Sequence, residues 1–373
     1  MKKILVLNYE FPPLGGGASP VSFEIAQKLS ETGEFDIDVV TMGYKDLSDY
    51  EEINPNFRVH RVKCLRSKKE ICHPWEQLTY LFTGYLKSAQ LIKELKKQNQ
   101  KYHICHTHFI IPTGVISYLL KKRFGLDYII TSHGSDVLGY NNRFKLIYPF
   151  VIKPWKIILD NAQKIIAPSN FLKTEIVKAY PQFVSENIEI IPNGFDLERF
   201  QPQEKKKYIF SSGRLQPAKG FQYLIEAVSE EDLGYEVHIA GDGPMMLELK
   251  KLAEKSKTKV FLHGWLDNRG REYKDLLEQS AIYVLASEKE NASIALLEAM
   301  SAGCAVITTN VSGCPETVGK AGILFPPKNI LLLGEAIKGM IGNEKIWSDY
   351  SIKEIKNRFD WNIILKEYIK KYE

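Results

Sequence analysis

Cysteine is scarce in this chain. Its 373 residues include five cysteines, and no two of them have the spacing Cys-x-x-Cys. A disulfide framework and a cysteine-rich zinc site are therefore excluded, and a reducing compartment such as the cytoplasm is favoured.

Long apolar runs are also lacking. The run that starts at Ile4 ends after four residues, which is too short for a signal peptide and typical of a first buried strand. The best later candidate, residues 146–159, is broken by two prolines and two lysines. Because a membrane-spanning helix needs about 20 predominantly apolar residues, we expect none.

The composition is otherwise that of a soluble globular protein, with 44% hydrophobic and 25% charged residues. A chain of this length is typical of two domains. The net charge of +5 is unevenly spread, because residues 53–156 carry 18 basic and 5 acidic side chains. Such a basic stretch predicts an acidic partner.

Short apolar runs alternate with helical patterns along the chain, which predicts the α/β class with parallel sheets covered on both faces. A polar stretch at residues 196–207 separates two such series, and two doubly wound domains bind ligands in a cleft at the carboxyl ends of their strands. Ser19 is expected to cap the first helix, with Pro20 at its first position and Gly33 left-handed after its end. The expected strands are residues 3–8, 37–41, 57–62, 104–108, 128–132, 164–168 and 189–191, then 208–212, 237–240, 260–263, 282–286, 306–309 and 323–325.

A glycine loop follows the first expected strand, where Gly15, Gly16 and Gly17 lead into a helix. Backbone N–H groups at a helix N-terminus can hold an anion. The loop is not a dinucleotide fingerprint, since Pro20 stands where the third glycine is needed and no acid ends the second strand. A tight strand-to-helix turn remains the alternative interpretation.

Polar side chains also follow two later strands of the first half. His133 and Asp136 leave one strand three residues apart, where they are placed to contact a hydroxylated substrate. His108 ends the preceding strand beside Cys105 and His106. Alternation puts Cys105 on the opposite face from the two histidines, so a metal site is disfavoured and His108 is expected to line the cleft.

Two charged motifs stand in the second half. Arg214 and Lys219 leave a strand five residues apart, and a guanidinium with an ammonium suits a diphosphate. Glu290 precedes an expected helix and Glu298 lies inside it, and both are expected to face the cleft. The N–H groups of residues 292–294 can bind anionic oxygens, although a solvated acidic helix is the plain alternative.

In order and spacing, these motifs resemble the retaining glycosyltransferases of family 4, which have the GT-B fold of two facing Rossmann-like domains around a central cleft. The resemblance covers nearly the whole chain and implies domains at residues 1–196 and 197–356, with a last helix at about 357–373 returning to the first. Where this family usually has Gly-Phe-Gly, the chain has Asn291-Ala292-Ser293. The motifs that carry the resemblance are Gly15-Gly16-Gly17, His133-Gly134-Ser135-Asp136, Ile191-Pro192-Asn193-Gly194-Phe195-Asp196, Gly213-Arg214, Lys219-Gly220, Ala240-Gly241-Asp242-Gly243-Pro244 and Glu290-x7-Glu298-Ala299-Met300.

The resemblance also implies roles for single residues. The family pattern makes Arg214 and Lys219 the ligands of the donor diphosphate, Glu298 the acceptor of ribose hydroxyls, and His133 and Glu290 the catalytic groups near the sugar. It adds Gly16 and Gly17 as phosphate donors, residues 291–294 (Asn291, Ala292, Ser293 and Ile294) as the donor-sugar loop, and His108 and Asp136 as further contacts.

The function that this resemblance implies is metal-independent transfer of a hexose from a nucleotide sugar, with UDP favoured over GDP, to a lipid-linked or cell-surface glycan. No cofactor or metal is expected, because Arg214 and Lys219 can balance the charge of the leaving diphosphate in place of a metal ion. A sugar-nucleotide epimerase of the same fold and a nicotinamide-dependent oxidoreductase are the alternatives.

The basic stretch at residues 53–156 has a separate interpretation. Its cations alternate with aromatic and aliphatic side chains, and such segments bind anionic bilayer surfaces. This predicts a peripheral enzyme on the cytoplasmic face of a membrane, while nucleic acid is disfavoured because acids interrupt the stretch. A solvated basic face that attracts the nucleotide sugar is the alternative. The apolar residues concerned are Trp75, Tyr80, Phe82, Tyr85, Leu86, Phe144, Tyr148, Phe150, Val151 and Trp155.

Overall fold

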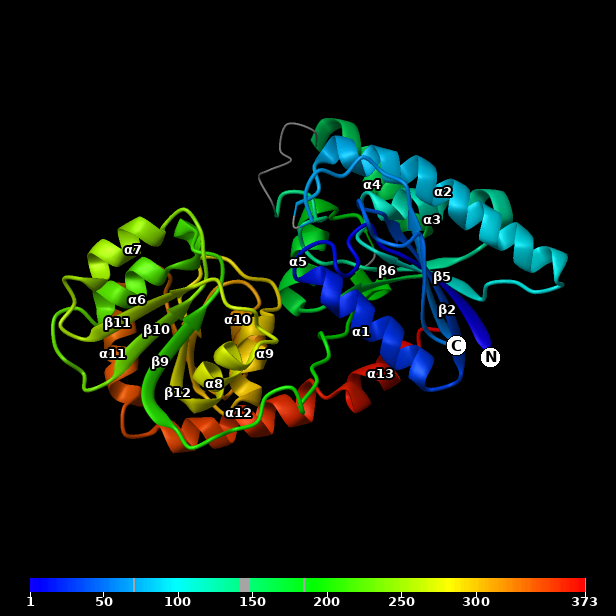
Figure 1. The fold of residues 1–373 in the computed structure, drawn as a ribbon. Coiled ribbons are helices and arrows are strands. Elements are labelled where there is room, and N and C mark those ends of the chain that lie inside the picture. The colour runs from blue at the N-terminus through cyan, green and yellow to red at the C-terminus, as the bar shows by residue number, and fades with distance from the viewer. Residues whose placement is uncertain (70, 141–147, 184, 373) are drawn as a thin grey trace. The chain divides into compact units, whose positions relative to one another are not determined.

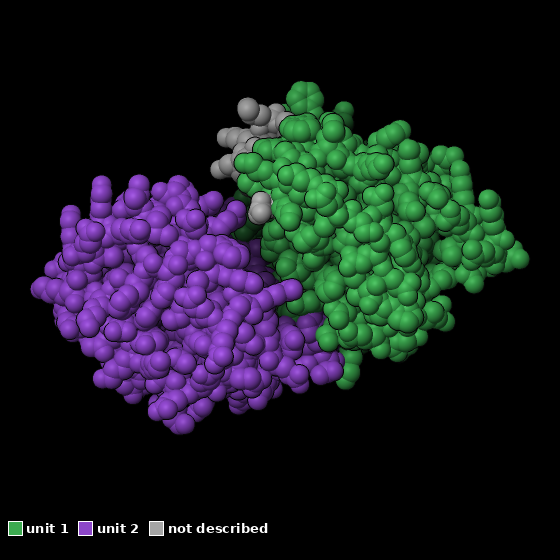
Figure 2. All heavy atoms as spheres, in the orientation of Figure 1, with its two compact units in different colours: residues 1–194, 364–373 green, residues 195–363 purple. Residues whose placement is uncertain are grey.

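The computed structural model describes residues 1–69, 71–140, 148–183 and 185–372. The chain divides into two compact units: unit 1 is Met1–Gly194 with Ile364–Glu373, and unit 2 is Phe195–Ile363. Figures 1 and 2 show the units as a ribbon and as spheres. The junctions lie two residues before the expected domain boundary and about seven residues after the expected start of the returning segment.

Unit 1 has an eight-stranded sheet in the order β3-β4-β2-β1-β5-β6-β7-β8. All neighbouring strands are parallel except β3, which runs antiparallel to β4 at the edge. This strand was not expected from the sequence, because its polar, largely exposed residues lack an apolar run. The strands are β1 (Lys2–Leu7), β2 (Phe35–Met42), β3 (Tyr50–Asn54), β4 (Phe57–Val62), β5 (Ile104–His108), β6 (Tyr128–Thr131), β7 (Lys164–Ala167) and β8 (Ile188–Ile190).

The helices of unit 1 pack on this sheet. The first begins at Ala18, so Ser19 and Pro20 are its second and third residues, and the cap and the first position that we expected there are wrong. Gly33 has the left-handed φ of +73° that was expected. The helices are α1 (Ala18–Glu31), α2 (Pro74–Lys97), α3 (Thr113–Phe124), α4 (Tyr148–Asn161), α5 (Asn170–Ala179) and the short η2 (Ser185–Asn187).

Unit 2 has a six-stranded parallel sheet in the order β11-β10-β9-β12-β13-β14. Its strands are β9 (Lys206–Ser212), β10 (Glu236–Ala240), β11 (Lys259–Gly264), β12 (Ser280–Leu285), β13 (Ala305–Thr309) and β14 (Gly322–Phe325). Its helices are η3 (Pro217–Lys219), α6 (Phe221–Ala227), α7 (Met246–Ala253), α8 (Arg271–Gln279), α9 (Ile294–Ser301), α10 (Cys314–Val318), α11 (Ile330–Met340) and α12 (Glu344–Arg358), and α13 (Trp361–Ile369) begins in it.

Strand order fixes where each sheet offers a binding site. The chain order of the unit 2 strands across the sheet is 3-2-1-4-5-6, so the topology reverses between β9 and β12. In unit 1 the reversal falls between β1 and β5. Loops at the carboxyl ends of these central strands form the crevice that ligands use in doubly wound sheets.

The end of the chain is anchored in unit 1. Tyr368 and Tyr372 are each 1% exposed, and the hydroxyl of Tyr372 lies 2.6 Å from Nδ1 of His106 on β5. The ammonium of Lys2 donates to the Tyr372 carbonyl at 3.0 Å. Buried aromatic packing and these polar contacts therefore hold the end of α13 and the residues after it on unit 1. Of the helices in the described ranges, none is long and apolar enough to cross a membrane.

Candidate active site

The loops after β9 and β12 bring the charged motifs of unit 2 together at its topological switch point. Arg214 and Lys219 follow β9, and Glu290 follows β12 just before α9. A backbone hydrogen bond of 2.8 Å from Glu288 N–H to the Ala218 carbonyl joins the two loops. The sequence predicted all three residues at strand ends, and this topology makes those ends neighbours.

Two glycines allow loops at this end of the sheet to approach one another closely, Gly220 after β9 and Gly313 after β13. Gly220 has φ of +74°, and a Cβ there would lie 2.1 Å from the Ala286 carbonyl oxygen. A Cβ on Gly313 would lie 1.6 Å from the Asn291 carbonyl oxygen, and the Gly313 N–H donates to the Glu290 carbonyl at 3.2 Å. Any larger residue at either position would separate these backbones.

Lys219 and Glu290 form an ion pair in which the ammonium donates to the carboxylate. Both side chains are partly buried, with 27% and 14% exposed. Arg214 is exposed and lies five residues before Lys219 in the sequence. Ser293 is the N-cap of α9, so the helix begins at Ile294 and its first N–H groups have no partner within the helix. The arrangement offers two cations and a helix N-terminus to an anionic ligand.

Glu298 lies inside α9 and is only 3% exposed. Its carboxylate accepts from Tyr273 at 2.9 Å and from Asn268 at 3.3 Å, and it pairs with Arg199 at 3.0 Å. Burial raises the pKa of Glu298, although Arg199 and these hydrogen bonds favour the charged form. The expectation that Glu298 points into an open cleft is therefore wrong in this respect: its carboxylate is packed within unit 2.

The residues that contact Glu298 could not be predicted from the sequence. Arg199 lies three residues after the motif that ends at Asp196, but no pattern relates it to a helix a hundred residues later. The hydroxyl of Tyr273 also contacts Ser212 at 2.9 Å, and Ser212 lies 3.1 Å from the Tyr283 hydroxyl. A buried polar network thus joins α9 to the end of β9.

In unit 1 the glycine loop follows β1, the first strand of the switch point. Gly16 and Gly17 are exposed, and the Gly16 N–H donates to a Glu10 carboxylate oxygen at 3.3 Å. The Gly16 N–H is thus paired with a carboxylate of unit 1 itself. The helix that follows begins at Ala18, with Gly17 as its N-cap.

His108 and His133 lie next to one another where β5 and β6 end. Nδ1 of His108 is 3.0 Å from Nε2 of His133, and the rings stack with centroids 5.3 Å apart. Nε2 of His108 makes no hydrogen bond to any described residue. Burial lowers the pKa of His133 to about 3 and that of His108 well below its ordinary value. The pair is therefore neutral, and one nitrogen donates while the other accepts.

Asp136 has a structural place between these strand ends. It is 7% exposed and accepts from the N–H groups of Ile110 at 2.7 Å and His133 at 3.0 Å. The Ser132 hydroxyl donates to it at 3.1 Å. Burial raises the pKa of Asp136 in spite of these donors. Its carboxylate ties the loop after β5 to the loop after β6 and so orients His133.

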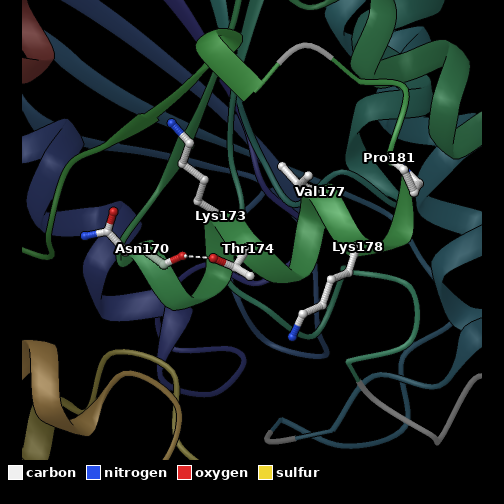
Figure 3. A pocket seen from close by; sticks show the side chains of 6 residues that line it. All are labelled: Asn170, Lys173, Thr174, Val177, Lys178 and Pro181. Carbon is white, nitrogen blue, oxygen red and sulfur yellow. Dashed lines mark hydrogen bonds between the residues drawn. The ribbon is translucent and has the colours of Figure 1, made fainter.

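Within residues 1–69, 71–140, 148–183 and 185–372, no group of three His, Cys, Asp or Glu side chains is arranged to hold a metal ion. A surface hollow of about 480 Å³ lies along α5 in unit 1 (Figure 3). It contains none of the predicted site residues, and the ammonium of Lys173 on its rim donates to the Ile188 carbonyl at 3.0 Å. We assign this hollow no role in catalysis.

Curated proteins with similar sequences include glycosyltransferases. A curated relative, an uncharacterized glycosyltransferase of Methanocaldococcus jannaschii, is 24% identical over all of this chain and 98% of its own length. An Escherichia coli UDP-Gal:α-D-GlcNAc-diphosphoundecaprenol α-1,3-galactosyltransferase is 27% identical over 83% of this chain and 80% of its own.

Solved structures share the fold. Sucrose-phosphate synthase of Thermosynechococcus elongatus matches with a TM-score of 0.81 at 19% identity, over 100% of this chain and 98% of its own. Anabaena HepE, solved with UDP, matches with a TM-score of 0.76 at 16% identity, over 100% and 99%.

Two family models divide the sequence between them. Glycosyltransferase Family 4 matches residues 15–199, and Glycosyl transferases group 1 matches residues 194–357. They meet at the junction of the two units and leave only the chain ends unmatched. The chain therefore belongs to the GT-B glycosyltransferases that combine these two families.

Proposed function

We propose that the protein is a retaining glycosyltransferase that moves a hexose from a UDP-sugar to a lipid-linked or cell-surface glycan. The observation that carries this proposal is the charged cluster at the unit 2 switch point, where Lys219 and Glu290 are paired beside the N-terminus of α9. UDP is favoured over GDP because UDP is bound to one structural neighbour and a UDP-sugar names one relative.

The donor diphosphate is proposed to bind Arg214 and Lys219, with the amides of residues 292–294 at the start of α9. A diphosphate carries charge that one ammonium and one guanidinium can balance, and helix N–H groups add fixed dipoles. In unit 1 the N–H groups of Gly16 and Gly17 are proposed as further phosphate donors. The Gly16 N–H already holds a carboxylate oxygen.

Transfer is proposed to need no metal ion. When the bond from the anomeric carbon to the diphosphate breaks, the leaving group gains negative charge. Preorganised donors aimed at such charge are worth about 2.7–4 kcal/mol each. Arg214, Lys219 and the α9 amides supply that stabilisation in this proposal, so chelation should leave turnover unchanged.

His133 and Glu290 are the proposed catalytic residues at the sugar. His133 is neutral and fixed by His108 and Asp136, so it can exchange hydrogen bonds with sugar hydroxyls without carrying charge. Glu290 is held by Lys219, and the loop that carries it continues with Asn291, Ala292 and Ser293 into α9. These loop residues are proposed to contact the donor sugar.

The lipid-linked acceptor is supported by relatives whose names include a diphosphoundecaprenol galactosyltransferase and the GPI3 subunit of a phosphatidylinositol N-acetylglucosaminyltransferase. A thermal-shift panel of UDP-, GDP- and ADP-sugars tests the donor. A ligand at 100 times its dissociation constant stabilises a protein by about 2.7 kcal/mol, so the UDP-sugar should give the largest shift.

Product analysis tests the reaction. NMR of the product should show the anomeric configuration of the donor, and addition of EDTA should leave the rate unchanged. An inverted product would refute retention, and activity that EDTA abolishes and Mn²⁺ restores would refute metal independence. Conversion of the donor without acceptor to its epimer would favour the epimerase instead.

A further inference from the structure

Helix α2 carries apolar residues on the side that points away from its own domain. Trp75, Leu78, Phe82 and Leu86 are 54%, 64%, 66% and 50% exposed. Their spacing of three, four and four residues places them along one face of the helix. We call these four residues the α2 outer face. Single exposed apolar residues are common, but a contiguous row of large ones indicates an interaction surface.

The inner face of the same helix is also largely apolar and is buried against the rest of unit 1. Tyr80 is completely buried and donates from its hydroxyl to the Val40 carbonyl on β2 at 2.8 Å. Gly84 and Leu91 follow on that side with little or no exposure. On a helix with 100° between residues, this buried row lies roughly opposite the α2 outer face. The outer face is thus not needed for the core of unit 1.

Lysines lie on α2 and on the segment that precedes it. Helix α2 contains two acidic residues, and one of them, Glu76, is buried and accepts from the N–H groups of Ser67 and His73. Four lysines lie on the helix, and Lys93 and Lys97 continue the outer face along its last turns. Hydrogen bonds from residues 65 and 67 to α2 hold the preceding segment beside the helix. That segment carries the exposed Lys68 and Lys69.

Neighbouring helices add to this surface. Helix α3 contacts both α2 and α4, and the three run beside one another in Figure 1. Arg123 at the end of α3 donates to the Tyr85 hydroxyl of α2 at 3.1 Å. Phe150 on α4 is 81% exposed. Arg123 therefore lies beside α2, and α4 carries a further exposed aromatic residue on the helix next to α3.

Some residues that suggested membrane binding from the sequence do not belong to this surface. Tyr80 and Trp155 are fully buried, and the indole N–H of Trp155 donates to the Asp136 carbonyl. Arg143, Phe144 and Lys145 lie outside the described residues. The prediction therefore depends on α2 and the segment that precedes it rather than on the whole stretch.

We propose that the α2 outer face inserts into the interfacial region of an anionic lipid bilayer, with the surrounding lysines contacting lipid headgroups. A row of Trp, Leu and Phe flanked by lysines matches the chemistry of an anionic membrane, whose surface attracts cations and whose acyl boundary accepts apolar side chains. The proposal deepens the proposed function, because a lipid-linked acceptor would then be met at the surface where the enzyme docks.

Vesicle co-sedimentation of the full chain tests the proposal. Neutral vesicles of phosphatidylcholine and anionic vesicles that also contain about 30 mol% phosphatidylglycerol are compared at low and high salt. We expect binding to the anionic vesicles that weakens at least tenfold at high salt, since surface charges are screened. Equal recovery in the supernatant with both vesicle types at low salt would overturn the proposal.

Paired variants locate the surface. Leu78→Ser with Phe82→Ser, and separately Lys68→Glu with Lys69→Glu, should each lower vesicle affinity at least tenfold. The matched controls are Leu247→Ser, at a 74% exposed position on α7, and Lys250→Glu with Lys251→Glu on the same helix. Equal losses in the unit 2 controls, or no loss in the α2 variants, would refute the assignment.

Fluorescence gives an independent reading of depth. Trp75 on the α2 outer face should produce a blue shift on vesicle binding that is absent in Trp75→Phe, and the same shift in both proteins would refute insertion. UDP thermal shifts should be unchanged in all of these variants. Vesicle binding without a UDP shift would refute the donor assignment alone, and a UDP shift without vesicle binding would refute the membrane proposal alone. If the α2 variants lose self-association while vesicle binding is unchanged, the α2 outer face is a protein interface and the proposal is overturned.

Discussion

Glu298 offers a sharp test because its carboxylate is packed against partners in unit 2, and the family resemblance implies that the same carboxylate accepts from the donor ribose. Replacing it by alanine leaves the guanidinium of Arg199 and the amide of Asn268 without their buried partner. Breaking a buried ion pair by removing one side costs about 3–5 kcal/mol. Arg199 keeps 23% of its side chain exposed, so we expect the lower end of that range, about 3 kcal/mol.

The expected stability loss is measurable by calorimetry. In domains of this size each kcal/mol lowers Tm by about 2–4 °C. The unit 2 transition of Glu298→Ala should therefore fall by about 6–12 °C. A Tm within 1 °C of the wild-type value would refute the reasoning, because it would mean that the carboxylate is solvated rather than packed against Arg199 and Tyr273.

A conservative variant separates the two roles of this side chain. Glu298→Gln keeps the shape and an acceptor oxygen for Tyr273 but also loses the ion pair with Arg199, so its Tm should fall by no more than that of Glu298→Ala. If Glu298 accepts from ribose hydroxyls, UDP affinity should still drop at least tenfold, since only one acceptor oxygen remains. Wild-type affinity for UDP in this variant would refute the ribose assignment.

Glu278 supplies the matched control. It is 5% exposed in the same unit, on α8, and its carboxylate accepts from the N–H of Gln201 at 2.8 Å and the amide of Gln203 at 2.6 Å. Glu278→Ala should lower Tm without changing UDP affinity. If destabilisation alone weakened UDP binding, this control would show it as well.

Two further predictions concern the charged loops and the buried histidines. Lys219→Ala should weaken UDP binding and transfer at least 100-fold. Glu290→Gln should leave UDP binding equal or tighter but slow transfer by a similar factor. UDP binding is measured by calorimetric titration, and equal effects of both variants on it would contradict their separate roles. Burial lowers the pKa of His106 and of His133 to about 3 and that of His108 well below 6.5, so all three stay neutral in the fold and take up protons on unfolding in acid. Each then costs about 1.4 kcal/mol per pH unit below 6.5, so unit 1 should lose about 4 kcal/mol between pH 7.5 and 5.5 in urea unfolding. Unchanged stability over that interval would contradict neutral burial.

Much of the fold could be predicted because parallel strands leave a strong signal. Strands such as β12 are buried on both faces and appear in the sequence as short, largely apolar runs between polar segments. The boundaries from the sequence agree with the structure within about two residues for such strands. β3 gave no such signal, since an exposed edge strand needs no apolar residues and is defined by its pairing with β4.

The candidate site was predictable in part for the same reason. A doubly wound sheet places its binding loops after the strands at which the order reverses. Residues identified at those strand ends therefore lie next to one another: Lys219 pairs with Glu290, and His108 lies beside His133. What the sequence could not supply was the environment of each side chain, because burial depends on contacts between distant segments.

Glu298 and Gly16 illustrate that limit in opposite ways. The helix pattern located Glu298 but could not reveal that Arg199, from the start of unit 2, closes over its carboxylate and that Tyr273 links it to β9. The glycine pattern predicted an anion-binding loop, and the structure pairs the Gly16 N–H with the carboxylate of Glu10. Lys219 is likewise held by Glu290. Two of the proposed phosphate-binding groups therefore already hold carboxylates, so a donor diphosphate must exchange with these oxygens in order to bind. The affinity of a diphosphate for either group then depends on the difference between two anions at that group, a quantity that no single motif encodes.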